Sequence, residues 1–319
     1  MDFSDWTKRL KLYARQVNTM DGVVHNFYIG EKAEEEEIQK VEAEMGFGLP
    51  GEFREVLKGY AKSIDISWSF DESTEDKIPE PFKDKVSSGW CCWDLNQLKD
   101  INHYKNELVQ TCFIELDVPG AEQLLNTFAF LTVPNGDYLL IDMNSPDAPV
   151  TYLSHEMDKM HGYRLGNSFI DFIEKWTLIG CVGPEDWQLE PFIKDASAGI
   201  DADSSIAARF REFVGFDSRH LEEAAMLTPE QLITPKKEWF HSLLGDTWER
   251  KYEIITEEIK TRQQFESIIP AINGAVLNEA EYKRGLEKEG THRLISFKEY
   301  INPKLKKTIF KPNRNYESF

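Results

Sequence analysis

Histidine side chains are the first residues to consider for metal chemistry, and their spacing does not favour a metal site. Zinc needs three or four nitrogen, sulfur or oxygen ligands around one point. His155 and His161 stand six residues apart, and no third ligand is spaced to join them. His155 and Glu156 match only half of the H-E-x-x-H motif of zinc proteases. The pattern predicts a surface loop there, with no bound metal and no other cofactor.

Cysteine chemistry is a second possibility. The chain has four cysteines, Cys91, Cys92, Cys112 and Cys181, and no C-x-x-C pair. In a strand, the adjacent Cys91 and Cys92 point to opposite faces, which suits neither one tetrahedral metal nor a shared disulfide. A nucleophilic cysteine needs a histidine partner, and His103 is near three of them in sequence. The spacing favours buried free thiols in a reducing cytosol.

The glycine and serine motifs of common enzymes are absent. The sequence has no G-x-x-x-x-G-K-S/T, no G-x-G-x-x-G and no G-x-S-x-G. Gly46–Gly48 separates two helical segments, and Gly166–Ser168 fits a helix cap. Asp137 and Asp142 lie in an expected hairpin, where an aspartate most often accepts hydrogen bonds from the backbone. We therefore predict that the chain is not an enzyme.

Tryptophans beside carboxylates point to a different chemistry, the binding of another protein. Tryptophan anchors many interface hot spots. Trp90 and Trp93 lie on opposite faces of a regular strand, so one of them can be exposed, although burial is the more usual fate of each. The candidate partner-binding residues are Trp90, Trp93, Asp94, Asp71, Glu72, Asp142 and Asp147.

The distribution of charge favours a basic partner. The 319 residues carry a formal net charge of -19, and residues 1–185, with 17 Lys and Arg against 33 Asp and Glu, account for -16. Such a surface repels nucleic acid and anionic membranes, and it attracts basic proteins. Solubility alone is the other explanation of this acidity. We expect a protein partner, and neither nucleic acid nor a membrane.

Hydrophobic periodicity and chain breakers predict the elements that position these residues. Asn135-Gly136 between two apolar runs predicts a β-hairpin. Gly46–Pro50 separates a Glu-rich helix from a second helix. In chain order, we expect helices over 3–20, 33–45, 50–60, 94–104 and 169–176, strands over 23–29, 64–70, 89–93, 127–133, 138–143 and 150–153, and a charged loop over 71–87.

The length of the chain allows two domains. We place the boundary near 183–200, with an α+β domain over 1–185 and a mainly α-helical domain over 186–319. The helical segments expected in the second domain are 206–214, 236–244, 248–264 and 279–289, with a short turn at 229–232.

Residues 283–314 carry ten Lys and Arg against three Asp and Glu. This basic stretch either docks on the acidic half or on another molecule, or is a solvated end. No secretory signal and no apolar run of ~18–20 residues is visible, so we expect the protein in the cytoplasm.

Four segments, in order and with their spacing, resemble the SUKH superfamily, the group of bacterial immunity proteins and cell-wall assembly regulators. They are Ile38–Leu57, with its Gly-aromatic break and Leu-Pro; Phe128–Asp142, with Asn-Gly-Asp at the turn; Val150–Glu156; and Ser168–Ile173. The chain departs from the family pattern at Tyr60–Ser63, where a glycine-rich turn is common. The resemblance covers about residues 30–180. It implies an α+β fold with helices packed on a mainly antiparallel sheet, and neither a cofactor nor catalysis.

The resemblance and the charge together suggest an immunity-type protein that neutralises a toxin, such as a nuclease, by binding and occluding it. The alternative is a regulatory or scaffold protein of the cell-wall-regulator type that binds cellular partners. An enzyme of unrecognised type, with its site in the C-terminal half, is the third hypothesis. The sequence leaves the partner, the oligomeric state and the role of residues 200–319 open.

Overall fold

A computed structural model describes residues 3–20, 22–70, 74, 77–157 and 159–234. Asp71 and Glu72, the basic stretch 283–314 and the three helices expected after residue 235 lie outside the described residues. None of the helices in the described part of the chain is both long enough and apolar enough to cross a membrane.

The first antiparallel sheet has three strands, in the order β1 (Val23–Ile29), β2 (Ser63–Ser69) and β3 (Ser88–Asp94). Buried and half-buried residues alternate along β2 and β3, because successive side chains of a strand point to opposite faces. Ile64, Ile66 and Trp68 therefore face the core, as the period-two pattern predicts. Residues 77–87 form no helix or strand, in agreement with the expected loop.

The second antiparallel sheet has four strands, in the order β4 (Thr127–Thr132), β5 (Tyr138–Asp142), β6 (Val150–Leu153) and β7 (Arg164–Gly166). The predicted hairpin joins β4 to β5. Gly136 has a φ of 95°, in the left-handed region that glycine adopts without strain, and the Val133 amide donates to the Asp137 carbonyl at 2.8 Å.

The strands thus form two sheets, where the sequence suggested a single main sheet. After β3 the chain enters α5 (Leu98–Leu108), and Asn102 on this helix reaches the outer edge of β4. Its Nδ2 donates to the Ala129 carbonyl at 2.8 Å, and its Oδ1 accepts from the Ala129 amide at 2.9 Å. These bonds occupy backbone groups that a neighbouring strand would need. Helix α5 therefore protects the outer edge of β4 from pairing with another strand.

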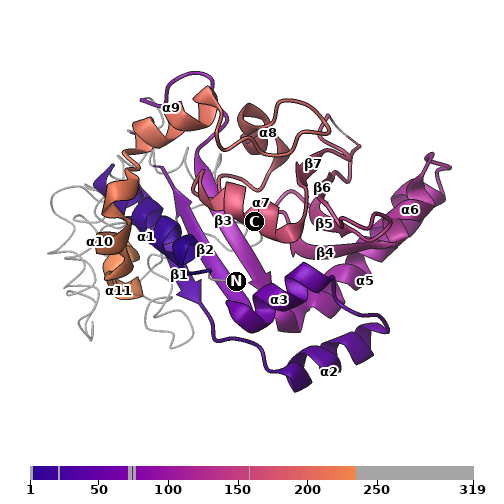
Figure 1. The fold of residues 1–319 in the computed structure, drawn as a ribbon. Helices are drawn as coiled ribbons and strands as arrows, with labels where there is room; N and C mark the ends of the chain where they lie inside the picture. Colours follow the sequence, from indigo (N-terminus) through magenta and orange to yellow (C-terminus); the bar gives the residue numbers. More distant parts are fainter. Residues whose placement is uncertain (1–2, 21, 71–73, 75–76, 158, 235–319) are drawn as a thin grey trace, which may run out of the picture. The chain divides into compact units, whose positions relative to one another are not determined.

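Helices pack on both faces of the second sheet (Figure 1). On one face, α3 (Gly51–Gly59) and α7 (Phe169–Thr177) share the main core, where the Phe169 ring lies 4.8 Å from Phe53 and 5.0 Å from Phe130, edge to face. On the other face, α5, a π-helical turn (Val109–Ile114) and α6 (Ala121–Leu125) bury a smaller cluster around Phe113 and Leu140. The expected α+β fold with antiparallel pairing is confirmed for this region.

The expected helix–break–helix unit is also present. The first helix, α2 (Glu35–Met45), starts with a capping box in which Glu37 accepts from the Glu34 amide at 2.8 Å. It ends at Gly46, whose φ is 81°. Arg54 on α3 then forms an ion pair with Glu35, and this hydrogen-bonded guanidinium is the main reason that the pKa of Glu35 falls to about 2. The ion pair between Arg54 and Glu35 holds α2 against α3.

Short helices make up residues 178–234, and α1 (Ser4–Thr19) holds the last of them (Figure 1). The Lys11 ammonium donates to the carbonyls of Ala225 and Leu227 at 2.9 and 2.6 Å, and Asn18 donates to the Leu232 carbonyl at 2.6 Å. Such bonds satisfy carbonyls that a helix leaves free at its C-terminal end. The short helices after Leu178 are α8 (Asp186–Leu189), a 3₁₀ turn (Glu190–Phe192), α9 (Ser205–Val214), a second 3₁₀ turn (Ser218–His220), α10 (Leu221–Ala225) and α11 (Pro229–Leu232).

The domain boundary near 183–200 stays a prediction. Phe192, Phe210 and Leu232 belong to the same hydrophobic cluster as the first sheet, and the unit to which the described residues belong extends to Ile233. For the residues after 200, whose role the sequence leaves open, these contacts fit a structural brace up to Ile233.

Candidate functional site

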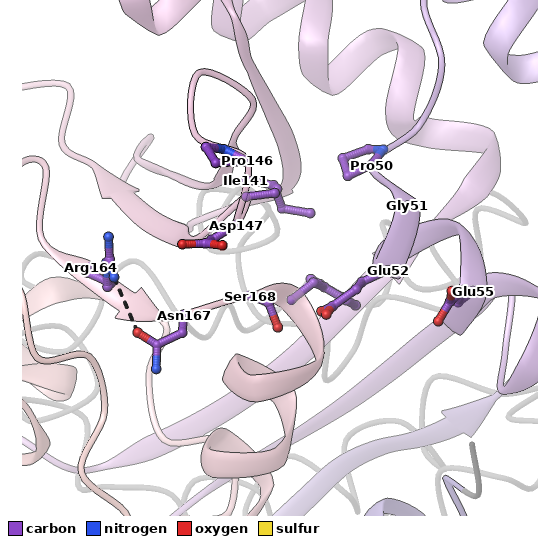
Figure 2. Close-up of a pocket in the computed structure, with 12 residues that line it drawn as sticks. Pro50, Gly51, Glu52, Glu55, Ile141, Pro146, Asp147, Arg164, Asn167 and Ser168 are labelled. Carbon is purple, nitrogen blue, oxygen red and sulfur yellow. Dashed lines mark hydrogen bonds between the residues drawn. The ribbon is translucent and has the colours of Figure 1, made fainter.

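A pocket of about 650 Å³ opens where three segments meet: the start of α3, the loop between β5 and β6, and the turn from β7 into α7 (Figure 2). Its volume lies in the ~300–1,000 Å³ range of ligand pockets. The polar side chains that line it are Glu52, Glu55, Asp147, Arg164, Asn167 and Ser168. The remaining lining residues are Pro50, Gly51, Ile141, Pro146, Ala148 and Phe169.

Three carboxylates and one guanidinium give the pocket a net negative charge. Glu55 and Asp147 are exposed, whereas Glu52 and Arg164 are half-buried. Within the described residues none of the four forms an ion pair. Arg164 instead donates from Nη1 to the Asn167 side-chain oxygen at 3.3 Å. The pocket therefore presents charges that are available to a ligand.

The start of α3 positions two of the carboxylates. Pro50 precedes the helix, and its fixed φ suits a helix start. Glu52 and Glu55 follow three residues apart, so they project from the same side of α3. The Glu52 carboxylate also accepts from the Ile170 amide at 2.8 Å, which satisfies one of the free amides at the start of α7. This bond holds the start of α3 against the start of α7.

The start of α7 forms the floor. Ser168 is the helix cap, and its hydroxyl accepts from the Asp171 amide at 3.3 Å, which confirms the helix cap expected at Gly166–Ser168. The Asn167 amide donates to the Asp171 carboxylate at 2.7 Å. Ile141 and Phe169 beneath are only 1% exposed, so the floor is a packed apolar surface.

The loop between β5 and β6 forms the opposite wall. Asp142 accepts from the Asn144 amide at 2.9 Å, and the Asp142 amide donates to the Pro149 carbonyl at 2.9 Å. Asp142 thus stabilises the turn, as the sequence suggested for turn aspartates. Asp147 follows on the exposed part of the loop and extends its carboxylate over the pocket (Figure 2).

The predicted partner-binding residues fall in different places. Asp147 lines the pocket, and Asp142 lies beside it. Trp90 and Asp94 lie on the outward face of β3, where the Trp90 indole donates to Asp65 at 2.9 Å and Asp94 caps the following turn. Trp93 is 2% exposed, so its side chain offers no surface to a partner; the core needs a large ring there. The prediction that Trp90 and Trp93 lie on opposite faces of the strand is confirmed.

Sequence reasoning missed Glu52, Glu55 and Arg164. Two features of the sequence could have indicated them: Glu52 and Glu55 are spaced to share one face of a helix, and Arg164 comes just before a helix cap. The pairing of β7 with β6 that brings Arg164 to the pocket could not be read from a three-residue strand.

Cysteine nucleophiles are disfavoured by the structure. Cys91 and Cys181 are buried free thiols. Burial, and then the hydrogen bond with Cys181, raises the pKa of Cys91. Burial raises the pKa of Cys92 to about 12. Cys91 and Cys92 therefore stay protonated near neutral pH, and a protonated thiol is a poor nucleophile.

A buried carboxylate was also not expected. Asp137, at the hairpin turn, accepts from the Tyr152 hydroxyl at 2.6 Å and from the His155 ring and amide at 2.6 and 2.8 Å. His155 is thus tied to the turn instead of lying free in a loop. Across the described residues, no three histidine, cysteine or carboxylate side chains gather in a way that could hold a metal ion.

The segments that build the pocket match a known family. A model of the SMI1/KNR4 family (SUKH-1) matches residues 32–175. The chain contains a SUKH-1 domain. This confirms the resemblance seen in the sequence. A comparison with curated proteins gives no match. The SUKH-1 domain contains every residue that lines the pocket.

Proposed function

We propose that the chain is an immunity-type protein whose SUKH-1 domain binds a basic toxin domain and blocks the toxin's active site without catalysing a reaction. The observation that carries the proposal is the net negative pocket inside the SUKH-1 domain, whose four charged side chains form no ion pair with any described residue. Immunity proteins are among the members that the SUKH resemblance implies.

Electrostatics supports this mode of action. The net charge of -16 over residues 1–185 accelerates the encounter with a basic protein and opposes binding of nucleic acid. A nuclease is a fitting target, because its active site is built to bind phosphate and surface carboxylates can take that place. Stable inhibitor interfaces bury about 1,600 Å², so the pocket is one part of a larger contact. We place this interaction in the cytoplasm, where the four cysteines remain reduced.

Co-expression tests the proposal. The gene is expressed together with each toxin-like gene encoded beside it, and growth is compared with that of cells that express the toxin alone. We expect growth to be restored with one such toxin, and the two chains to co-purify in a stoichiometric complex. The association rate should fall steeply as salt concentration rises.

Failure of every neighbouring toxin to be neutralised would contradict the immunity role. The family is also consistent with a regulatory or scaffold protein. A pull-down that returns several abundant cellular proteins, and no stoichiometric toxin, would favour that alternative.

A further inference from the structure

Two charged residues of α3 face different parts of the protein, one toward α2 and the other toward the pocket. Arg54 turns to α2, where it pairs with Glu35 and Glu42. Glu55 is the next residue, about 100° further round the helix, and it lines the pocket without an ion pair among the described residues. The guanidinium of α3 is therefore paired within the protein, whereas Glu55 borders the cavity without an ion pair among the described residues.

The opposite end of the cavity carries the complementary donor. Arg164 is half-buried, and among the described residues its guanidinium donates to one side-chain acceptor, Asn167. A guanidinium has five N–H donors in a fixed fork, so most of them remain available. Asp147 lies on the Arg164 side of the opening and Glu55 lies across it on α3 (Figure 2). A fitting occupant therefore carries a positive charge between these two carboxylates and offers a carbonyl or carboxylate oxygen to Arg164.

The shape of the cavity narrows the class of occupant. Its apolar floor, Ile141 and Phe169, suits the methylene stem of a long basic side chain. Its volume of about 650 Å³ accommodates the tip of a loop and excludes a folded domain. A metal ion is disfavoured, because these carboxylates are not among any metal-binding group of described residues.

We propose that this pocket receives a loop of the partner protein, with one arginine or lysine side chain attracted by the carboxylates of Glu55 and Asp147 and a backbone carbonyl of the same loop held by Arg164. The inference rests on the proposed function, since it names the part of the toxin that the SUKH-1 domain recognises. Glu52 joins the start of α3 to the start of α7 through its bond to the Ile170 amide.

Peptide binding to the full-length chain tests the pocket directly. An amidated Gly-Arg-Gly peptide is compared with the same peptide containing citrulline, the uncharged isostere of arginine. We expect the arginine peptide to shift the NMR signals of the Gly51, Ala148 and Asn167 amides, and the citrulline peptide to shift them much less. The Glu55→Gln/Asp147→Asn double variant should bind the arginine peptide about tenfold more weakly, since two exposed carboxylates that attract the cation are lost.

A matched control removes the same charge elsewhere. Glu36 and Glu115 are exposed and do not line the pocket, so the Glu36→Gln/Glu115→Gln variant should bind the arginine peptide like the wild type. Equal binding of the two peptides, no shifts at the pocket, or an equal loss in both double variants would each overturn the inference.

The partner assay separates this inference from the proposed function. If the wild type neutralises a neighbouring toxin and the Glu55→Gln/Asp147→Asn variant does so with unchanged affinity, the pocket is not the recognition site although the immunity role stands. If the arginine peptide binds as expected but no toxin is neutralised, the pocket stands and the immunity role fails.

Discussion

Lys105 is a buried lysine on α5 whose ammonium group meets only neutral oxygens. It is 1% exposed, and its Nζ donates to the Thr127 and Leu124 carbonyls at 2.8 and 3.0 Å. Burial lowers its pKa from the ordinary 10.5 to about 8. The difference between these pKa values corresponds to roughly 3 kcal/mol, at about 1.36 kcal/mol for each pH unit.

The free energy of unfolding depends on pH because Lys105 has different pKa values in the folded and the unfolded chain. Below pH 8, Lys105 is protonated in both the folded and the unfolded chain. Between pH 8 and 10.5, the unfolded chain still holds the proton that the folded chain has released. The free energy of unfolding therefore rises with pH in this window, whereas a Lys105→Met variant lacks this rise.

Urea unfolding at a series of pH values across the window measures the effect. The quantity to follow is the free energy of unfolding of the wild type minus that of Lys105→Met, because tyrosines and cysteines that titrate in the same range are common to both proteins. This difference should increase by roughly 3 kcal/mol from pH 8 to 10.5. A Leu108→Met variant on the same helix, which removes no ionisable group, should follow the wild type. A constant difference between wild type and Lys105→Met would refute the reasoning.

Two further substitutions test the packing. Asp137→Ala leaves the Tyr152 hydroxyl without its buried acceptor and should cost about 3–5 kcal/mol in urea unfolding; a loss below about 1 kcal/mol would show that the carboxylate is dispensable. Gly89→Ala places a Cβ 2.5 Å from the Trp68 ring and should cost about 1–3 kcal/mol; an unchanged Tm in thermal unfolding would contradict this.

Local signals in the sequence predicted most elements of the described chain. Asn135-Gly136 located a hairpin because a tight turn needs a left-handed residue, and Gly46–Pro50 located a break between helices for related reasons. The two faces of β3 followed from the period of two. Each of these features depends on residues close together in the chain.

Features that depend on distant residues were not predictable. The division into two sheets follows from Asn102 on a helix that binds Ala129 on a strand, and neither residue indicates the other. The pocket likewise joins Glu52 to Ile170, which are 118 residues apart in the chain. Of its lining residues, the sequence indicated only Asp147 as a partner-binding residue, because a loop carboxylate is recognisable without its neighbours.

The helices outside the SUKH-1 domain take no part in the pocket, which strengthens the assignment of the pocket to that domain. Helices α1, α10 and α11 lie outside residues 32–175; α1 contacts both other helices and strands β1 and β2, and α11 contacts β1. None of their residues lines the pocket, whose walls come from α3, the β5–β6 loop and the start of α7. The additions therefore stabilise one side of the fold without contributing to the pocket. A binding role of the pocket should accordingly depend on α3 and α7, and be insensitive to surface substitutions in α10.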